Sequence, residues 1–189
     1  MVPFPKSNPK GMTRKSFQKR NRGVKKTILM YGEGLTEKIF LKYLKWLYID
    51  DSKMAVKIKS GRGGSPKSLV MGASKEFGSF GKKIVVLDND RGKKEIEEAR
   101  DKAREEGIII LENSPCLEAT FLSILHPEKE FSNKKSKWCK KEFKAKYVKG
   151  KNRTDLEEYK KVFPKHILDE RKNEISELKL LINLMEGKE

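Results

Sequence analysis

Four short apolar runs alternate with helix-like segments between residues 27 and 125 of this 189-residue chain. Unbroken apolar strands that alternate with helices are typical of a parallel sheet covered by helices on both faces. We therefore predict an α/β fold with right-handed connections between its strands. The predicted strands are residues 27–31, 54–59, 83–87 and 108–111.

Residues that begin and end helices mark the segments between these runs. Ser65 followed by Pro66 is typical of an N-cap and a first helical residue, and Gly107 is typical of a helix end. These signals make the chain a strand-helix unit repeated along its first two thirds. The predicted helices are residues 36–48, 66–77, 93–106 and 116–125.

No further strand is predicted after Pro127, where the sequence becomes basic and helical. Apolar spacing supports the last of these helices as a single amphipathic one. The helices predicted in this part are residues 137–147, 154–163 and 168–185. The predicted units are a flexible basic arm (1–25), an α/β domain (26–128) and a basic helical extension that packs on the core (129–189).

The formal net charge of +17 is unevenly distributed along the chain. Residues 1–32 and residues 129–153 each contribute +9, so the rest of the chain is close to neutral. Polyanions, most often nucleic acids, are the usual partners of such basic patches. A solvated surface with no partner is the alternative interpretation of the same charges.

Several classes of protein do not fit the composition. No apolar run approaches the ~20 residues of a membrane-spanning helix, and no apolar segment follows the basic N-terminus as in a secretory signal. Cys116 and Cys139 suit a reducing compartment, and His126 and His166 are too few for most zinc enzymes. We therefore expect a cytoplasmic protein without a membrane partner, in which Cys116 packs in the core and His126 ends a helix.

Carboxylates follow three of the four predicted strands. Glu33 and Glu37 follow the first strand, Asp88 and Asp90 follow the third, and Glu118 begins the helix after the fourth. Parallel strands end at one edge of a sheet, where ligands of α/β proteins bind. Crowded carboxylates repel one another, and a hard cation such as Mg²⁺ or Mn²⁺ relieves that repulsion. The alternative is that these acids only form turns and cap helices.

Two of these acidic motifs resemble those of a known superfamily. Residues 28–37 (ILMYGEGLTE) resemble the first motif of Toprim domains, in the E-G-x-T-E form of OLD-type nucleases, and residues 87–90 (LDND) resemble the Toprim D-x-D motif. Within that superfamily the chain is most similar to the RloB-like family, on residues 113–118 (NSPCLE) and on Leu125-His126. The resemblance covers roughly residues 14 to 165 and implies a Toprim-like sheet.

The chain departs from the family pattern at three places. Gly32 stands where the family commonly has Cys, and the loop between Glu33 and Thr36 is one residue shorter. Ala119 and Thr120 stand where the family tends to have a bulky aromatic residue. None of these departures removes a carboxylate.

The resemblance implies a metal-dependent nuclease that hydrolyses DNA or RNA in anti-phage defence, beside an ATPase or a restriction system. It implies that Glu33 is a metal ligand or a general acid or base, and that Asp88 and Asp90 hold Mg²⁺ or Mn²⁺. Glu37 would add a contact to the metal's surroundings or to a second metal. Glu118 corresponds to the acidic residue that begins the following helix.

Basic residues near these motifs are candidates for nucleic-acid contacts. Arg62 and Lys67 lie in and after a glycine-rich loop that can cradle a phosphate, although a plain flexible connection is equally consistent. Arg91 follows the D-x-D motif and can neutralise a phosphate or stay in solvent. The candidates in the second basic region are Lys140, Lys141, Lys144 and Lys149.

Three aromatic residues, Trp138, Phe143 and Tyr147, are interleaved with those lysines. They can stack on unpaired bases, but we favour a stripe that faces the core. Two other functions remain open: a nucleic-acid-binding subunit of a defence complex without catalysis, and a nucleotidyl transferase of the primase kind.

Overall fold

The computed structural model of this chain describes residues 25–51, 53–148 and 155–188. Within these residues four strands form one parallel sheet in the order β2-β1-β3-β4. This arrangement confirms the predicted α/β fold with a four-stranded parallel sheet. The strands are β1 (Lys26–Gly32), β2 (Met54–Ser60), β3 (Lys82–Asp88) and β4 (Ile109–Asn113).

Eight helices accompany the sheet in the described part of the chain. Ser65 caps the second of them through its hydroxyl, which accepts a hydrogen bond from the Ser68 backbone N–H at 3.2 Å. None of the helices in the described ranges is long and apolar enough to cross a membrane. The helices are α1 (Leu35–Tyr48), α2 (Pro66–Ser74), α3 (Lys93–Glu105), α4 (Leu117–Leu125), α5 (Ser136–Lys146), α6 (Leu156–Val162), α7 (Lys165–Arg171) and α8 (Ser176–Glu186).

The prediction of one helix over residues 168–185 is wrong, because α7 and α8 are separate helices. Ile175 is extended, with φ −116° and ψ 107°, and its backbone N–H donates to the Arg171 carbonyl at 3.2 Å. Leu168 before the break and Leu178 after it are both buried. The apolar residues therefore keep the spacing of a continuous helix across the turn. For this reason the sequence periodicity did not reveal the break between α7 and α8.

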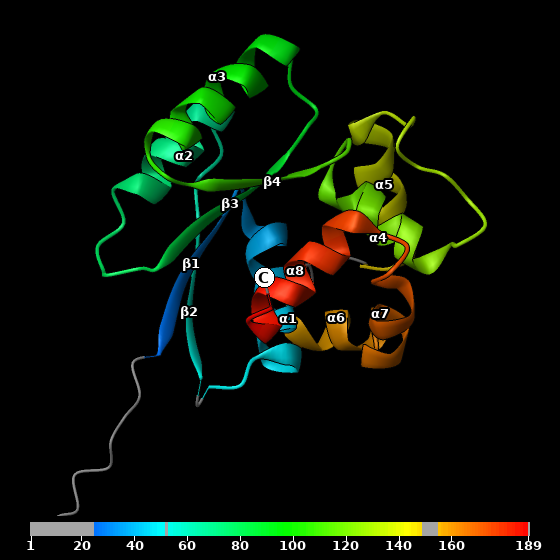
Figure 1. Cartoon of the computed structure of the whole chain (residues 1–189). Coiled ribbons are helices and arrows are strands. Elements are labelled where there is room, and N and C mark those ends of the chain that lie inside the picture. The colour runs from blue at the N-terminus through cyan, green and yellow to red at the C-terminus, as the bar shows by residue number, and fades with distance from the viewer. Residues whose placement is uncertain (1–24, 52, 149–154, 189) are drawn as a thin grey trace, which may run out of the picture.

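Two apolar layers lie on the two faces of the sheet (Figure 1). Successive side chains of a strand point to opposite faces. On β1, Ile28 and Met30 accordingly face the layer formed with α1 and the later helices, whereas Leu29 faces the layer formed with α2 and α3. β1 and β3 are thus buried on both faces, as their unbroken apolar sequences predict, whereas the edge strand β2 exposes Ala55 and Lys59.

A cluster of buried aromatic rings attaches the later helices to the sheet domain. Phe121 of α4 lies at its centre, with its ring centroid 4.6 Å from that of Phe40 in α1 and 4.9 Å from that of Phe143 in α5. Tyr159 and Phe163 complete the cluster from α6 and the residue that follows it. The predicted arm, apart from Lys25, lies outside the described residues.

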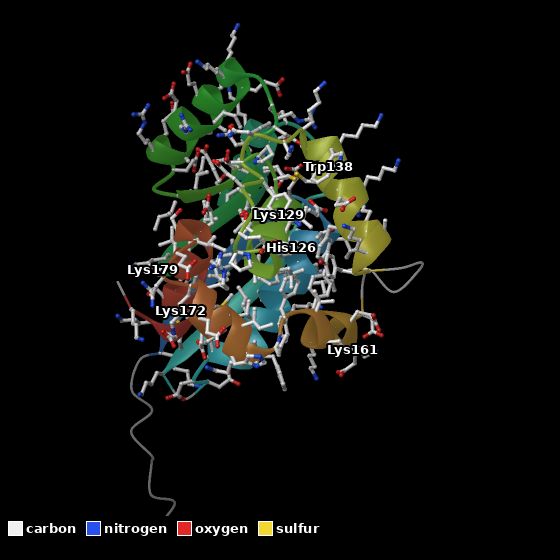
Figure 2. The ribbon with its side chains drawn as sticks, turned by 90° about the vertical axis from the view of Figure 1, so that its right-hand side faces the viewer. His126, Lys129, Trp138, Lys161, Lys172 and Lys179 are labelled. Carbon is white, nitrogen blue, oxygen red and sulfur yellow. The ribbon has the colours of Figure 1, made fainter. Side chains whose placement is uncertain are left out.

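The aromatic residues of α5 divide between the core and the surface. Phe143 is buried and Tyr147 is half-buried, as the core-facing stripe predicts. Trp138 (labelled in Figure 2) is 42% exposed, so the prediction that it faces the core is wrong. Its ring stacks on that of Phe131. Lys134 lies over the Trp138 ring, 5.8 Å from its centroid. Trp138 lies on a different face of α5 from Phe143, so its indole points away from the core.

Candidate metal centre

The candidate site lies where the order of the strands reverses. β1 is flanked by β2 and β3, and the chain leaves β1 and β3 toward helices on opposite faces of the sheet. Ligands of α/β proteins bind outside the carboxyl ends of the strands at such a point. Gly32 and Asp88 end the two strands here, so the motifs that follow them meet.

The turn after β1 is tight and requires glycine at position 32. A Cβ on Gly32 would lie 2.6 Å from the Cβ of Glu37 and 3.4 Å from the Lys38 backbone nitrogen. The Glu33 backbone N–H donates to the Val86 carbonyl at 3.1 Å, which holds the turn against β3. The short loop therefore leaves no room for a side chain at this position.

We expect Gly32→Ala to lower the free energy of unfolding by ~1–3 kcal/mol, because the added methyl overpacks the turn. Gly81→Ala is the matched control, since its Cβ would meet only the Thr27 carbonyl oxygen at 3.5 Å. Urea denaturation of both variants measures the difference. Equal losses in the two variants would contradict the packing argument.

Asp88 is the centre of the site and is only 2% exposed. Its Oδ1 accepts a hydrogen bond from the Leu117 backbone N–H at 2.9 Å, and its Oδ2 lies 2.8 Å from the Lys140 ammonium. Burial raises the pKa of Asp88, although the hydrogen bond and charge of Lys140 act in the opposite direction. This one side chain joins β3 to the beginning of α4 and to α5.

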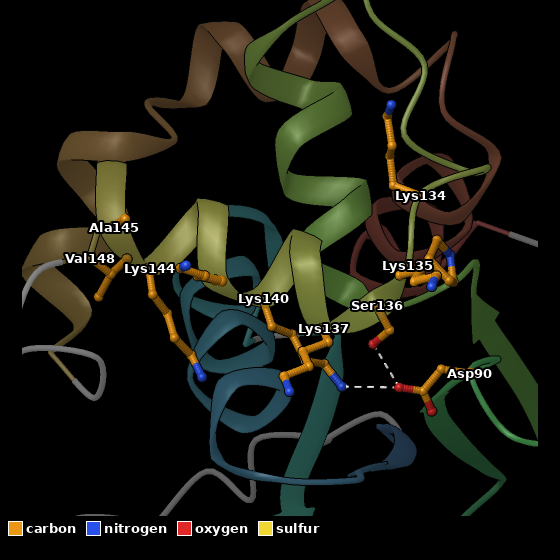
Figure 3. A pocket seen from close by; sticks show the side chains of 11 residues that line it. Asp90, Lys134, Lys135, Ser136, Lys137, Lys140, Lys144, Ala145 and Val148 are labelled. Carbon is orange, nitrogen blue, oxygen red and sulfur yellow. Dashed lines mark hydrogen bonds and ion pairs between the residues drawn. The ribbon is translucent and has the colours of Figure 1, made fainter.

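Asp90 shares the Lys140 ammonium with Asp88. Its Oδ2 accepts a hydrogen bond from the Ser136 hydroxyl at 2.7 Å and lies 3.3 Å from the Lys140 nitrogen (Figure 3). Burial alone would raise the pKa of Asp90, but the Ser136 hydrogen bond and the Lys140 charge lower it. A positive charge thus lies between the two aspartates of the D-x-D motif.

Glu33 and Glu37 approach Asp88 from the turn after β1. The Glu33 carboxylate accepts a hydrogen bond from the Asp88 backbone N–H at 3.4 Å, and the Glu37 carboxylate accepts one from the Gly34 backbone N–H at 2.8 Å. Burial and the charge of Asp88 raise the pKa of Glu33. Burial, with the charges of Asp88 and Glu118, raises the pKa of Glu37 to about 7.

The raised pKa of Glu37 makes the stability of the metal-free protein depend on pH. The folded chain holds this proton up to about pH 7, whereas the unfolded carboxyl loses it near 4.5, so stability falls as the pH rises between these values. We expect the free energy of unfolding of Glu37→Gln to exceed that of wild type by ~1–3 kcal/mol at pH 8. At pH 4.5 this difference should disappear. Urea titrations in EDTA at both pH values measure it. A difference that does not change with pH would contradict the assignment.

Glu118 is buried beside Asp88 at the start of α4. Its Oε2 has no hydrogen-bond partner in the described part of the chain. Burial, followed by the charge of Asp88, raises the pKa of Glu118. An unsatisfied buried carboxylate oxygen is rare. A divalent cation would supply the missing partner and relieve the repulsion among the acids, so the residues present fit such an ion.

The predicted nucleic-acid residues are found in different surroundings. Lys67 lies 3.6 Å from Glu98 of α3, and Arg62 is exposed in the glycine-rich loop. The Arg91 guanidinium lies 4.0 Å from Asp90. Lys140 is engaged with the aspartates rather than exposed for a phosphate. Lys149 lies outside the described residues.

A basic cavity opens beside Asp90, and Lys140, which is paired with both aspartates, also lines it. It has a volume of about 1090 Å³, and Asp90, Ser136 and Pro115 contribute to its wall (Figure 3). A dense group of ammonium groups next to carboxylates suits an anionic ligand that also contacts a cation. Its lysines are Lys134, Lys135, Lys137, Lys140, Lys141 and Lys144.

Sequence reasoning missed Ser136 and the ion pairs of Lys140. Both residues lie on α5 four positions apart, which places them on one face of the helix. That spacing was available as a signal, but the sequence did not show which element this face meets. In the structure, this face of α5 contacts Asp90, in the loop after β3.

No family model, curated protein or solved structure matches this chain.

Proposed function

We propose that this protein is a metal-dependent nuclease that hydrolyses phosphodiester bonds of DNA or RNA with Mg²⁺ or Mn²⁺. The observation that carries the proposal is the convergence of four acids beside a lysine-lined cavity at the carboxyl edge of the sheet. Acids alone would suit many sites, and lysines alone would suit any polyanion. Together they suit a phosphodiester that bridges a cation and a basic surface. The acids are Glu33, Asp88, Asp90 and Glu118.

Each group has a distinct part in this proposal. Asp88, Asp90 and Glu118 would hold the cation, which when bound polarises a phosphate oxygen and lowers the pKa of a bound water. Glu33 is half-buried and has a raised pKa, properties that suit a residue accepting a proton from the attacking water. The lysines of the cavity would hold the phosphates on either side of the reacting one.

Lys140 would stabilise the acids before the cation binds. Its ammonium neutralises Asp88 and Asp90 and so keeps the carboxylates together in the metal-free protein. A cation bound to both aspartates would replace it. The freed ammonium belongs to a side chain that already lines the cavity, where it would contact the substrate.

The resemblance to Toprim domains and to the RloB-like family belongs to the same proposal. A cytoplasmic location, a role in anti-phage defence and an ATPase or restriction-system partner rest on that resemblance. The contact between the Glu33 carboxylate and the Asp88 backbone N–H supports the part of the resemblance that pairs these two acids.

Cleavage of end-labelled substrates tests the proposal. Single-stranded and duplex DNA, and single-stranded and structured RNA, are incubated with the protein in Mn²⁺, in Mg²⁺ and in EDTA. We expect cutting of at least one substrate with a divalent cation and none in EDTA. Binding without any cutting would contradict it.

The second candidate is a nucleic-acid-binding module without catalysis. It is favoured by the ion pairs of Lys140, which neutralise Asp88 and Asp90 without any metal. In that case the acids fix α5 against the sheet and the exposed lysines provide the function. Salt-dependent binding that does not respond to Mn²⁺ would support this candidate.

The cavity lysines are expected to contribute to binding whichever candidate is correct. Replacing both Lys141 and Lys144 with Ala should weaken nucleic-acid binding and flatten its dependence on salt by about 2 in the log–log slope. Lys179→Ala on α8, away from the cavity (Figure 2), is the control and should leave the slope unchanged. Fluorescence anisotropy with a labelled oligonucleotide at several salt concentrations measures both. Equal slopes for the two variants would mean that the cavity does not hold phosphates.

A further inference from the structure

A cysteine stands among the acids of the candidate centre. Cys116 is the N-cap residue of α4 and its side chain is fully buried. Its sulfur, one oxygen of Asp88 and one oxygen of Glu118 all lie within 4.8 Å of one another. Metal–oxygen and metal–sulfur bonds are about 2.0–2.3 Å long, so one ion between these atoms can reach all three after small side-chain movements.

Glu118 gives independent support for a ligand at this point. Its Oε2 is buried and has no hydrogen-bond partner within residues 25–51, 53–148 and 155–188. The Cys116 thiol lies 3.9 Å from the Ser136 carbonyl oxygen and also contacts the Cys139 thiol. Asp88 is different, since Leu117 and Lys140 already occupy its oxygens. Glu118 therefore brings a buried oxygen without a partner to the same group of atoms as Cys116.

We propose that Cys116 is a ligand of the cation centre together with Asp88 and Glu118. A thiolate is a soft ligand, and among divalent ions it favours first-row transition metals over Mg²⁺. The centre would therefore select Mn²⁺, Co²⁺ or Zn²⁺ over Mg²⁺. The inference rests on the proposed function, which gives the location of the centre. It narrows the choice of cation for that function to transition-metal ions.

Binding at the sulfur involves no change of oxidation state. The S–H bond breaks, the proton leaves to the buffer, and the sulfur electron pair forms the bond to the metal. A thiol is deprotonated outright when it coordinates such an ion. In the metal-free protein, burial and the charges of Glu118 and Asp88 raise the pKa of the Cys116 thiol, so the proton leaves only when the cation binds.

Cys139 provides a matched control inside the same protein. It is also a free, fully buried cysteine, and it lies on α5. It is not part of the group formed by Asp88, Cys116 and Glu118. Its thiol contacts that of Cys116, so a Cys139→Ser variant removes the neighbouring sulfur while the proposed ligand stays in place.

Titration of the full chain with Co²⁺ tests the inference through absorption rather than activity. Wild type and Cys139→Ser should both develop a near-ultraviolet sulfur-to-cobalt charge-transfer band. Cys116→Ser should lack the band and bind Co²⁺ at least ~10-fold more weakly, since partners outside the ligand shell alone contribute that much. Circular dichroism establishes that the variants are folded.

Two results overturn the inference and are distinguishable. If wild type binds Co²⁺ saturably without the band, Cys116 is not a ligand, while the carboxylate centre of the proposed function stands. If wild type binds neither Co²⁺ nor Mn²⁺ saturably, the cation centre itself is wrong and the proposed function falls with it. A band that persists unchanged in Cys116→Ser also overturns the inference, because the sulfur would then belong to another residue.

Discussion

Asp88→Asn is expected to reduce cation-dependent cleavage by ~10³-fold or more. The substitution removes the charge of the carboxylate at the centre of the site, and cation stabilisation of a phosphoryl transition state amounts to several kcal/mol. Asparagine keeps an oxygen that accepts the hydrogen bond from the Leu117 backbone N–H, so the start of α4 should remain in place. Lys140 keeps Asp90 as a partner. Initial rates on the best-cleaved oligonucleotide measure the effect.

Glu112→Gln is the control for this prediction. Glu112 lies on β4, one residue before the end of the strand, but both of its carboxylate oxygens are bound by Arg100 of α3, at 2.7 and 2.8 Å. Removing its charge should leave the cleavage rate within a few-fold of wild type. If Asp88→Asn cuts as fast as Glu112→Gln, the catalytic assignment of the site is wrong.

Phe121→Ala is expected to cause the largest loss of stability, ~3–5 kcal/mol. Phe121 is completely buried, and its ring contacts those of Phe40, Phe143 and Phe163, with centroids 4.6 to 5.0 Å apart. Its removal leaves a cavity between helices that come from distant parts of the chain. The tightly packed neighbours cannot collapse into that space without moving whole helices.

Phe77→Ala is the matched control for the aromatic cluster, because Phe77 is 92% exposed. We expect its free energy of unfolding to stay within ~0.5 kcal/mol of wild type. Urea denaturation of both variants at one pH gives the comparison. Comparable stability of the two variants would mean that the cluster around Phe121 does not hold α5 and α6 on the domain.

The strands and the location of the acids could be predicted because both depend on local sequence. Apolar runs such as residues 83–87 are too short and too continuous for exposed helices, and they formed the buried strands. Glu33 and Asp88 directly follow two of those strands, so the rule for carboxyl ends of parallel strands placed them at one edge. The contacts between them agree with that expectation.

The remaining features depend on contacts between distant segments. Lys140 reaches Asp88 from a helix that comes after the last strand, and the sequence gives no sign of which element that helix meets. The turn at Ile175 interrupts a helix whose apolar period continues unchanged. Cys116 joins the acids only because the first residue of α4 lies in space beside Asp88, at the end of β3. Tertiary packing, rather than local pattern, decides each of these cases.

Binding of Mn²⁺ at equilibrium tests the central claim most directly, because it needs no substrate. Free Mn²⁺ is measured by electron paramagnetic resonance during titration of wild type, Asp88→Asn and Glu112→Gln at one pH. We expect saturable binding by wild type and by Glu112→Gln, and none by Asp88→Asn. No saturable binding by wild type, or equal binding by Asp88→Asn, would contradict a cation centre at the acids that end β1 and β3.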